Sequence, residues 1–380
     1  MFVATLLSLV LFFFTLVANA APMPIPAPPS IAAKSYLLID FDSGHTLMDR
    51  ASSARIEPAS ITKLMTAYVV YNELEKGTFN DADLVTISEK AWRMKGSRMF
   101  IEVGKQVSVK DLLRGLTIQS GNDASVALAE FVAGSEDSFV SHMNLYADRL
   151  GMSDTHFMNS TGLPHAEHYT SARDLAKLAR ALINNFPEQY KMYAEKQFVY
   201  NNIPQYNRNK LLWSDSSVDG LKTGHTESAG YCLASSAKRG EMRLISILLG
   251  AKSKKSRARE SQKMLDYGFR FFRTYKLYSK DQVLNRARIW KGEVSELPLG
   301  VSDDFYITIP RDQYGDLKAN MELQEPITAP ITQGTALGTV QVHLFDKLVK
   351  EQPLVALKEV PEGNFFQRSW DTVLESIDSF

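Results

Sequence analysis

A serine and a lysine three residues apart could form an activated nucleophile. Residues 58–67 read Pro-Ala-Ser-Ile-Thr-Lys-Leu-Met-Thr-Ala, and the apolar run that begins here is typical of a buried helix. Pro58 suits the entry to such a helix. Because helix positions i and i+3 share one face, the hydroxyl of Ser60 and the amine of Lys63 can touch. A neutral amine in that place can take the serine proton.

The chain holds a second copy of this spacing, at Ser235 and Lys238. Residues 230–237 and 242–250 read as two strands of an antiparallel hairpin. Side chains three apart on a strand point to opposite faces, so this copy cannot act as a pair. The helical context therefore favours Ser60 and Lys63.

Two later motifs complete a recognisable set. Ser120, Gly121 and Asn122 form a tight turn before a predicted helix at residues 124–132, although such a turn is common by itself. Lys222, Thr223 and Gly224 stand at the entry to a strand and mean little alone. The three motifs in this order resemble the serine penicillin-recognising enzymes, which are the penicillin-binding proteins and serine β-lactamases.

A closer resemblance covers nearly all of the chain after residue 20. The resemblance rests on residues 207–209, 222–226, 230–231, 268–272 and 361–366. They resemble the low-molecular-mass D-alanyl-D-alanine carboxypeptidases of Gram-negative bacteria. The resemblance implies removal of the terminal D-alanine from pentapeptide stems, acylation by β-lactams, and a part in peptidoglycan synthesis, cell wall biogenesis and cell shape.

The resemblance also implies catalytic roles. Ser60 attacks the carbonyl of the penultimate D-alanine and forms an acyl-enzyme. Lys63 is the base, and we expect desolvation and the nearby ammonium of Lys222 to lower its pKa. Ser120 relays a proton to the leaving amine. Backbone N–H groups of Ser60 and His225 form the oxyanion hole.

Substrate binding falls to a further group of residues, again by resemblance. Asn122 hydrogen-bonds the substrate backbone, and Gly224 completes the third motif. Thr223 and Arg257 hold the terminal carboxylate, with Arg208 assisting, since an arginine fork suits a carboxylate. Arg257 lies in a basic run, which is usually a solvated face. The side chain of His225 could equally be a surface strand residue, and Asp174 is read as a helix cap.

Two stretches depart from the pattern of related enzymes. The loop at residues 93–98 looks shorter than in the best-known relatives, which affects acyl-enzyme turnover and substrate preference. Residues 159–170 hold Glu167, but without the sequence that surrounds the deacylating glutamate of class A β-lactamases. We therefore expect slow release of bound penicillin rather than efficient hydrolysis.

The elements that must position these residues indicate an α+β fold. Strands at residues 36–40 and 46–48 precede a helical middle, and strands and a helix at residues 257–272 follow it. This order predicts a β-lactamase/transpeptidase-like antiparallel sheet with a helical cluster. Short alternating segments then predict a small all-β C-terminal domain. The expected limits are 32–278 for the catalytic domain and 281–361 for the β-rich domain.

A terminal amphipathic helix is expected at residues 363–380. One face carries large apolar side chains, namely Phe366, Trp370, Val373, Leu374 and Ile377. Its polar side sets Arg368 against acidic residues, so we expect a weaker anchor on the inner membrane surface than the family pattern. The alternative is that this stripe packs on another protein.

The N-terminal residues 1–20 read as a secretory signal peptide, with Ala18-Asn19-Ala20 as the cleavage site. No Lys or Arg precedes the apolar run, so the true start could lie upstream, and an uncleaved anchor is the alternative. Residues 21–31 form a proline-rich leader. We expect a periplasmic protein, peripheral on the inner membrane.

Composition bounds the remaining possibilities. Of 380 residues, 43 are Lys or Arg and 43 are Asp or Glu, so no global charge favours nucleic acid. The one cysteine, Cys232, is read as a core residue and excludes an internal disulfide. We expect no metal and no cofactor, because no His or Cys cluster has ligand spacing.

Two other activities remain open. A DD-endopeptidase would cut cross-links, but that branch of the family usually lacks the second domain. A non-turnover protein that binds penicillin or stem peptides is the other alternative. The complete set of three motifs argues against it.

Overall fold

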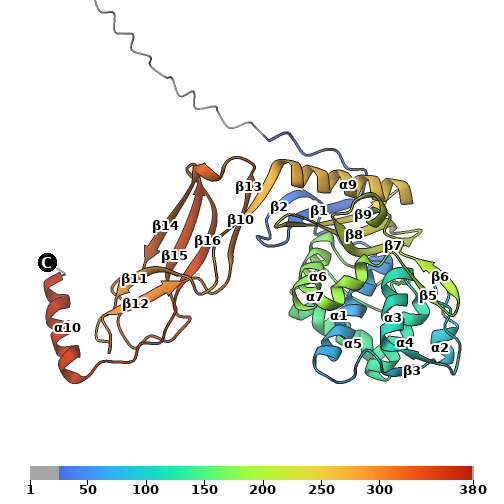
Figure 1. Cartoon of the computed structure of the whole chain (residues 1–380), viewed down its shortest axis with the longest axis horizontal. Coiled ribbons are helices and arrows are strands. Elements are labelled where there is room, and N and C mark those ends of the chain that lie inside the picture. Colours follow the sequence, from blue (N-terminus) through green and yellow to red (C-terminus); the bar gives the residue numbers. More distant parts are fainter. Residues whose placement is uncertain (1–24, 379–380) are drawn as a thin grey trace, which may run out of the picture.

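The computed structural model describes residues 25–378 of the chain (Figure 1). A five-stranded antiparallel sheet of order β2-β1-β9-β8-β7 lies at the centre of the larger domain. Its strands are β1 (Ser35–Asp40), β2 (Thr46–Arg50), β7 (Val218–Thr226), β8 (Gly230–Arg239) and β9 (Met242–Ala251). The first strand pairs with the last, so the helical middle of the chain is enclosed between them.

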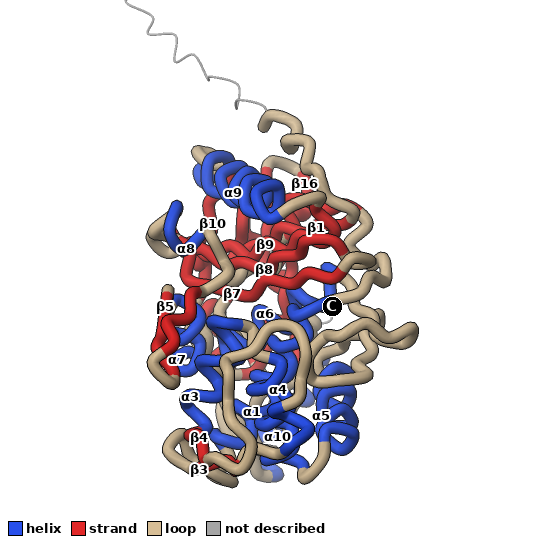
Figure 2. Tube along the Cα trace, turned by 90° about the vertical axis from the view of Figure 1, so that its right-hand side faces the viewer, coloured by secondary structure: helices blue, strands red, loops and turns tan. Residues whose placement is uncertain are grey.

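The sheet is covered on both faces because its side chains alternate. Leu37 and Ile39 pack with the helical cluster, whereas Leu38 between them packs with α9 (Lys254–Phe271). Figure 2 shows the strands between α9 and this cluster. The main helices of the cluster are α1 (Lys63–Glu75), α4 (Asn122–Ala133), α5 (Glu136–Arg149) and α6 (Ala172–Asn185).

Shorter elements surround this core. The helical pieces are η1 (Ala59–Thr62), α2 (Glu89–Trp92), α3 (Val109–Arg114), the π-helical turn η2 (Gly115–Gln119), α7 (Pro187–Tyr190), η3 (Lys191–Ala194) and α8 (Leu211–Ser214). Two small hairpins were not predicted, β3 (Leu84–Thr86) with β4 (Gln106–Ser108) and β5 (Gln197–Tyr200) with β6 (Ile203–Tyr206). Ser108 and Ser171 cap α3 and α6, each accepting a hydrogen bond from a backbone N–H.

The second domain has its own apolar core and is all-β, as expected. One sheet has the order β11-β12-β16-β15-β14, and β10 pairs with β13 in a separate ribbon. The strands are β10 (Phe272–Tyr278), β11 (Val283–Arg288), β12 (Glu296–Gly300), β13 (Phe305–Pro310), β14 (Leu317–Leu323), β15 (Ala336–Leu344) and β16 (Lys347–Ala356), with the turn η4 (Tyr314–Asp316). Helix α10 (Phe365–Asp378) lies at the end of the molecule away from the catalytic domain (Figure 1).

A buried carboxylate joins the two domains. Asp40, at the end of β1, accepts hydrogen bonds from the hydroxyl of Ser43 (2.8 Å) and from that of Thr274 on β10 (2.6 Å). Both hydroxyls also contact Thr308 of β13, at 2.6 and 2.9 Å. Lys350 of β16 adds a bond to the carbonyl of Ser43 (3.3 Å). These contacts hold the ribbon against the end of β1.

The fold class predicted from the sequence is confirmed, with shifts at particular boundaries. Helix α9 begins three residues earlier than predicted, because Ser253 caps it by accepting the N–H of Ser256. Residues 272–278, assigned to the catalytic domain from the sequence, form β10 and pair with the second domain. The predicted signal peptide and the first residues of the leader lie outside the described residues. Within the described residues, no helix has the length and apolarity needed to span a bilayer.

Candidate active site

The predicted contact between Ser60 and Lys63 is present. Ser60 lies in η1 and Lys63 opens α1, which places Lys63 Nζ 3.2 Å from Ser60 Oγ. The same amine donates to Asn122 Oδ1 (2.7 Å) and to the carbonyl of Thr161 (2.6 Å). Lys63 is only 1% exposed. It therefore contacts the hydroxyl of Ser60 and two carbonyl acceptors away from solvent.

These contacts suit a neutral amine that acts as a base. A neutral amine has two hydrogens and one lone pair. The two carbonyl oxygens take the hydrogens, which leaves the lone pair for the hydroxyl of Ser60. Burial and then the charge of Arg208 lower the pKa of Lys63 to about 7, against the opposing charge of Asp123. The second cause is thus Arg208, where we had expected Lys222.

Ser120 has an unusual backbone. It ends the π-helical turn η2 with φ 67° and ψ 35°, the left-handed region that few non-glycine residues adopt. This conformation directs its hydroxyl to Lys222 Nζ, 2.8 Å away. Burial, followed by the charge of Lys63, lowers the pKa of Lys222 well below its usual value. Ser120 and Lys222 thus form a second hydroxyl–amine pair beside the first.

Asn122 links the catalytic lysine to the loop at residues 93–98. Its Nδ2 donates to the carbonyl of Lys95 and its backbone N–H to that of Ser97, both at 2.7 Å. A Cβ on Gly96 would lie 2.9 Å from Asn122 Nδ2, so this approach needs glycine. Both polar atoms of the Asn122 side chain are engaged inside the protein. Its predicted contact with substrate stays a prediction.

Strand β7 lies directly against η1. A Cβ on Gly224 would come within 2.9 Å of the carbonyl of Pro58 and 3.1 Å of Ala59 Cβ. The glycine of the third motif therefore allows this strand to approach η1, which carries Ser60. Next to it, the exposed ring of His225 stacks on Tyr231 with centroids 4.0 Å apart.

Arg257 is buried, unlike the rest of its basic run. It is 7% exposed and donates to the carbonyls of Gly224 (3.3 Å) and Cys232 (3.4 Å). The interpretation of a solvated face is therefore wrong for this residue. Burial lowers its pKa to about 10.

Arg208 owes its place to two asparagines whose roles sequence analysis missed. Asn207 Nδ2 donates to the carbonyls of Tyr193 (3.2 Å) and Glu195 (3.1 Å). Asn209 Nδ2 donates to the carbonyl of Gly220 at 2.9 Å. Asparagines on both sides of an arginine, in a stretch without helical or strand periodicity, were the available signal.

One cavity of about 510 Å³ gathers the predicted residues. Eight of the ten line it, and the amines of Lys63 and Lys222 lie buried beneath its floor. The eight are Ser60, Ser120, Asn122, Arg208, Thr223, Gly224, His225 and Arg257. The lining includes no Asp or Glu, whereas Arg208, Lys210, Lys254 and Arg257 contribute positive charge. Such a cavity favours a ligand with a carboxylate.

Other parts of the molecule are poorer candidates. A larger hollow of about 870 Å³ lies between α6 and the second domain, but it contains none of the predicted site residues. Glu167 is exposed and does not line the catalytic cavity. Among the described residues, no group of three or more His, Cys, Asp or Glu side chains could hold a metal ion.

The segment at residues 155–170 contributes more than sequence analysis predicted. His168 is buried, accepts the N–H of Met158 at Nδ1 (3.2 Å), and therefore offers Nε2–H to Thr62 Oγ1 (2.9 Å). Thr62 lies between Ser60 and Lys63. Burial lowers the pKa of His168 to about 4, which keeps the ring neutral near pH 7. The turn that carries Ser60 is thus held in place through Thr62.

Comparison with known proteins agrees with this geometry. The profile of the D-alanyl-D-alanine carboxypeptidase family matches residues 23–253, and that of the penicillin-binding protein 5 C-terminal domain matches residues 272–362. The chain is 45% identical over 357 residues to D-alanyl-D-alanine carboxypeptidase DacA of Escherichia coli K12, covering 92% of this chain and 89% of that protein. It is 44% identical over 372 residues to DacC of the same organism, covering 96% and 93%.

Solved structures give the same result. Penicillin binding protein 5 from Haemophilus influenzae superposes with a TM-score of 0.87 at 41% identity, covering 89% of this chain and all of that one. Penicillin binding protein 6B from Escherichia coli gives a TM-score of 0.74 at 38% identity, covering 88% and 98%. The similarity spans both domains.

Proposed function

Since the chain belongs to the D-alanyl-D-alanine carboxypeptidase family, we propose that Ser60 is the nucleophile with which it removes the terminal D-alanine of peptidoglycan stems. The chain is a serine-type D-Ala-D-Ala carboxypeptidase and a penicillin-binding protein of cell wall metabolism. The observation that supports the assignment to Ser60 is the convergence of all three motifs on one cavity. Within that cavity, Ser60 lies in η1 directly before α1, and its hydroxyl is 3.2 Å from the buried amine of Lys63.

Acylation follows from these contacts. Lys63 takes the proton of Ser60, and Oγ attacks the carbonyl carbon of the penultimate D-alanine. The oxyanion is held by the backbone N–H groups of Ser60 and His225, and one such donor is worth about 3 kcal/mol. Ser120, supported by Lys222 at 2.8 Å, passes a proton to the amine of the leaving D-alanine. The product is an ester on Ser60 and free D-alanine.

Binding of the terminal carboxylate selects the cleavage site. Arg257, Thr223 and Arg208 all line the same cavity as Ser60. An arginine donates two parallel bonds to a carboxylate, which places the preceding amide over Ser60. A chain without a free carboxylate end binds less well in this arrangement. Carboxypeptidase action is therefore favoured over endopeptidase action.

Deacylation regenerates the enzyme. Water attacks the ester carbonyl, and Lys63 is the nearest base to receive its proton. A β-lactam follows the same first step, since its amide carbonyl accepts Ser60 Oγ. Glu167 lies outside the cavity lining, so it is not placed to activate the water. Slow release of penicillin fits this arrangement.

The location of the protein is part of the proposal. We infer export by the N-terminal signal peptide to the periplasm and peripheral attachment to the inner membrane through α10. The support is exposed apolar surface on that helix: Phe365 is 70%, Phe366 82% and Trp370 65% exposed. Removal of residues 365–380 should move the protein from the membrane to the soluble fraction. Retention on the membrane would contradict the anchor.

The first test is D-alanine release from a peptide that ends in D-Ala-D-Ala. Mature protein should release D-alanine, and Ser60→Ala should release none. A cross-linked dimeric peptide serves as the endopeptidase control and should be cut much more slowly. A protein that is acylated by penicillin but releases no D-alanine would be a binding protein, and the assignment to Ser60 as a peptidase nucleophile would fall.

A further inference from the structure

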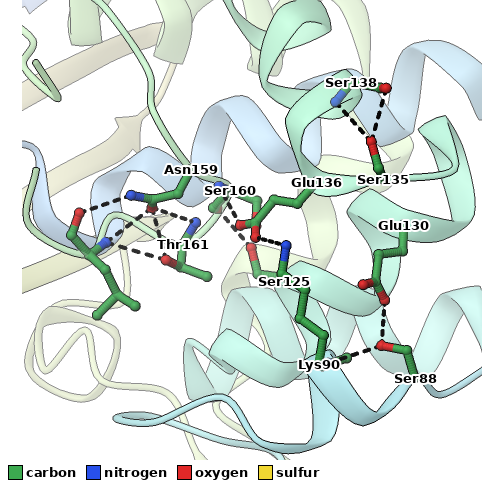
Figure 3. A network of polar contacts seen from close by, with 12 residues as sticks. Ser88, Lys90, Ser125, Glu130, Ser135, Glu136, Ser138, Asn159, Ser160 and Thr161 are labelled. Atoms are coloured by element: carbon green, nitrogen blue, oxygen red, sulfur yellow. Dashed lines mark hydrogen bonds and ion pairs between the residues drawn. The ribbon is translucent and has the colours of Figure 1, made fainter.

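A buried carboxylate outside the cavity is connected to the catalytic lysine. Glu136, in the first turn of α5, is 9% exposed and contacts two separate segments (Figure 3). Its Oε1 accepts the backbone N–H (3.1 Å) and the hydroxyl (2.8 Å) of Ser160. Its Oε2 forms an ion pair with Lys90 Nζ at 2.8 Å. Bonds to Lys90 and Ser160 outweigh burial and hold the pKa of Glu136 below its usual value.

The first connection runs through Ser160. The carbonyl of Ser160 accepts the hydroxyls of Thr66 on α1 (2.6 Å) and Ser125 on α4 (2.7 Å). The next residue, Thr161, presents its carbonyl to Lys63 Nζ at 2.6 Å. Asn159 Oδ1 accepts the N–H groups of Thr161 (3.2 Å) and Gly162 (2.7 Å), which closes the turn (Figure 3). The position of the Thr161 carbonyl therefore depends on Glu136.

The second connection runs through Lys90. This residue belongs to α2, which leads directly into the loop at residues 93–98. The cap of α2, Ser88, also donates to Glu130 on α4 at 2.6 Å, so α2 is held at two points (Figure 3). In the loop that follows, the carbonyl oxygens of Lys95 and Ser97 accept hydrogen bonds from Asn122. Asn122 Oδ1 is the second acceptor of the Lys63 amine, at 2.7 Å.

Both connections thus end on the same nitrogen. We propose that Glu136 is a positioning residue, which fixes the two carbonyl acceptors of Lys63 so that its lone pair faces Ser60. The proposal rests on the role of Lys63 as the base in the function proposed above. Glu136 touches neither the substrate nor the reacting atoms.

The consequence is chemical because the orientation of a neutral amine decides whether it can act. If either acceptor moves, the lone pair no longer aligns with the hydroxyl of Ser60. A displacement of about 1 Å in such a contact costs about 100-fold in rate. Loosened walls also admit water, which favours the ammonium form of Lys63.

Three variants separate the two connections. Lys90→Gln removes the ion pair and leaves Ser160 in place. Glu136→Gln keeps one acceptor for Ser160 and loses the charge that holds Lys90. Glu136→Ala removes both the acceptor for Ser160 and the ion pair with Lys90. Lys191→Gln is the matched control, because it removes an exposed (i, i+3) ion pair with Glu188 far from these contacts.

The readouts are the second-order rate of benzylpenicillin acylation against pH, and kcat and KM for D-alanine release. We expect a loss of about 3-fold for Lys90→Gln, and of about 10- to 100-fold for Glu136→Gln and Glu136→Ala in that order. The loss should fall on kcat with KM nearly unchanged. In the profile of acylation rate against pH, the midpoint on the acidic side should rise by about one pH unit.

The charges that act on the pKa of Lys63 are those of Arg208, before α8, and Asp123, from α4, and neither Glu136 nor Lys90 is among them. Lys222 from β7 and the neutral ring of His168 behind η1 also stay in place in these variants. A change in the midpoint of the pH profile therefore reports the position of the two acceptors. Thermal unfolding of each variant accompanies the kinetics.

The outcomes are distinct. A graded loss in kcat with a moved midpoint supports the proposal. Unchanged rates and midpoint in Glu136→Ala overturn it. A loss of kcat that parallels the fall in melting temperature, with an unchanged midpoint of the pH profile, also overturns the proposal. Such a result would mean that Glu136 has a purely structural role. If wild-type protein itself fails to be acylated while Ser60→Ala behaves identically, the proposed function fails instead.

Discussion

Two Ser-x-x-Lys sequences in this protein lie in different secondary structure, and only the first brings its serine and lysine side chains together. Ser60 and Lys63 lie across η1 and the start of α1, with their functional atoms 3.2 Å apart. Ser235 and Lys238 lie on β8, where Ser235 is fully buried and Lys238 is exposed. The Ser235 hydroxyl has no hydrogen-bond partner within the described part of the chain. The same four-residue spacing yields a reactive pair on a helix and two unrelated side chains on a strand.

The difference shows that the spacing acquires meaning from its surroundings. At Lys63, burial and a neighbouring arginine bring the pKa near 7, and two carbonyls orient the amine. On β8, Ser235 pairs with Leu221 of β7 and with Ser246 of β9, so the second copy lies within the sheet that supports β7. The first copy has the geometry of the proposed nucleophile and base.

The largest expected effect comes from removing the two hydroxyls in turn. Ser60→Ala should abolish D-alanine release, a loss of at least about 10⁴-fold in kcat. Ser235→Ala should keep full activity and raise the free energy of unfolding by about 1 kcal/mol, because it removes an unpaired buried hydroxyl. Steady-state kinetics and denaturant unfolding measure both. A loss of activity in Ser235→Ala would contradict the proposal that only the first Ser-x-x-Lys copy takes part in the reaction.

The two lysines should differ next. Because a neutral Lys63 is the base, acylation should rise with pH through about 7 and fall about 10-fold per pH unit below it. Lys63→Arg should lose about 10³-fold, since arginine stays protonated. Lys238→Arg, on the exposed side of β8, should match wild type. A pH profile for acylation that is flat between 5 and 9 would contradict this role for Lys63.

The ionisation of Lys63 should make the free energy of unfolding depend on pH in a defined direction. The pKa is about 7 in the folded protein against 10.5 for the free side chain. Between these values the unfolded chain binds more protons, so this contribution makes the fold more stable as pH rises from about 7 towards 10.5. Lys63→Met should therefore stabilise the protein most at pH 6 and progressively less at higher pH. Thermal unfolding across this range measures it, with Lys238→Met as the control.

The smallest expected effect concerns two glycines that border the two copies. Gly224→Ala places a Cβ against Pro58 and Ala59, so it should cost about 1–3 kcal/mol and reduce acylation about 10-fold. Gly240, in the turn after β8, has φ +60° with open space around it. Gly240→Ala should cost about 1 kcal/mol through backbone strain and leave the rate unchanged. Equal acylation rates in the two variants would show that β7 need not approach η1.

Sequence analysis predicted the fold class and the three motifs from local patterns, whereas most of the predicted residues that line the cavity came from the family resemblance. The pairing of Ser60 with Lys63 follows from helical spacing, and the burial of Cys232 from its strand. Predictions were less successful where distant segments meet. Neither the charge of Arg208 near Lys63 nor the link from Glu136 to Thr161 has a signature in sequence spacing, since the partners are far apart along the chain.

The backbone conformation of individual residues could not be predicted from the sequence either. The left-handed Ser120 depends on the π-helical turn before it, and nothing in Gly115–Gln119 distinguishes that turn from an ordinary helix end. Boundaries shifted for a similar reason. Ser253 could cap a helix or lie in a loop, and the contact with Ser256 decides it only once the chain has folded.

The junction at Asp40 has a geometric consequence for the whole enzyme. The hydroxyls of Ser43, Thr274 and Thr308 hold the β ribbon at the end of β1, while α10 extends from the opposite end of the second domain (Figure 1). If a membrane holds α10, as proposed above, the second domain also fixes the distance and orientation of the catalytic cavity relative to that membrane. The cavity would then act on stem peptides that lie at that distance.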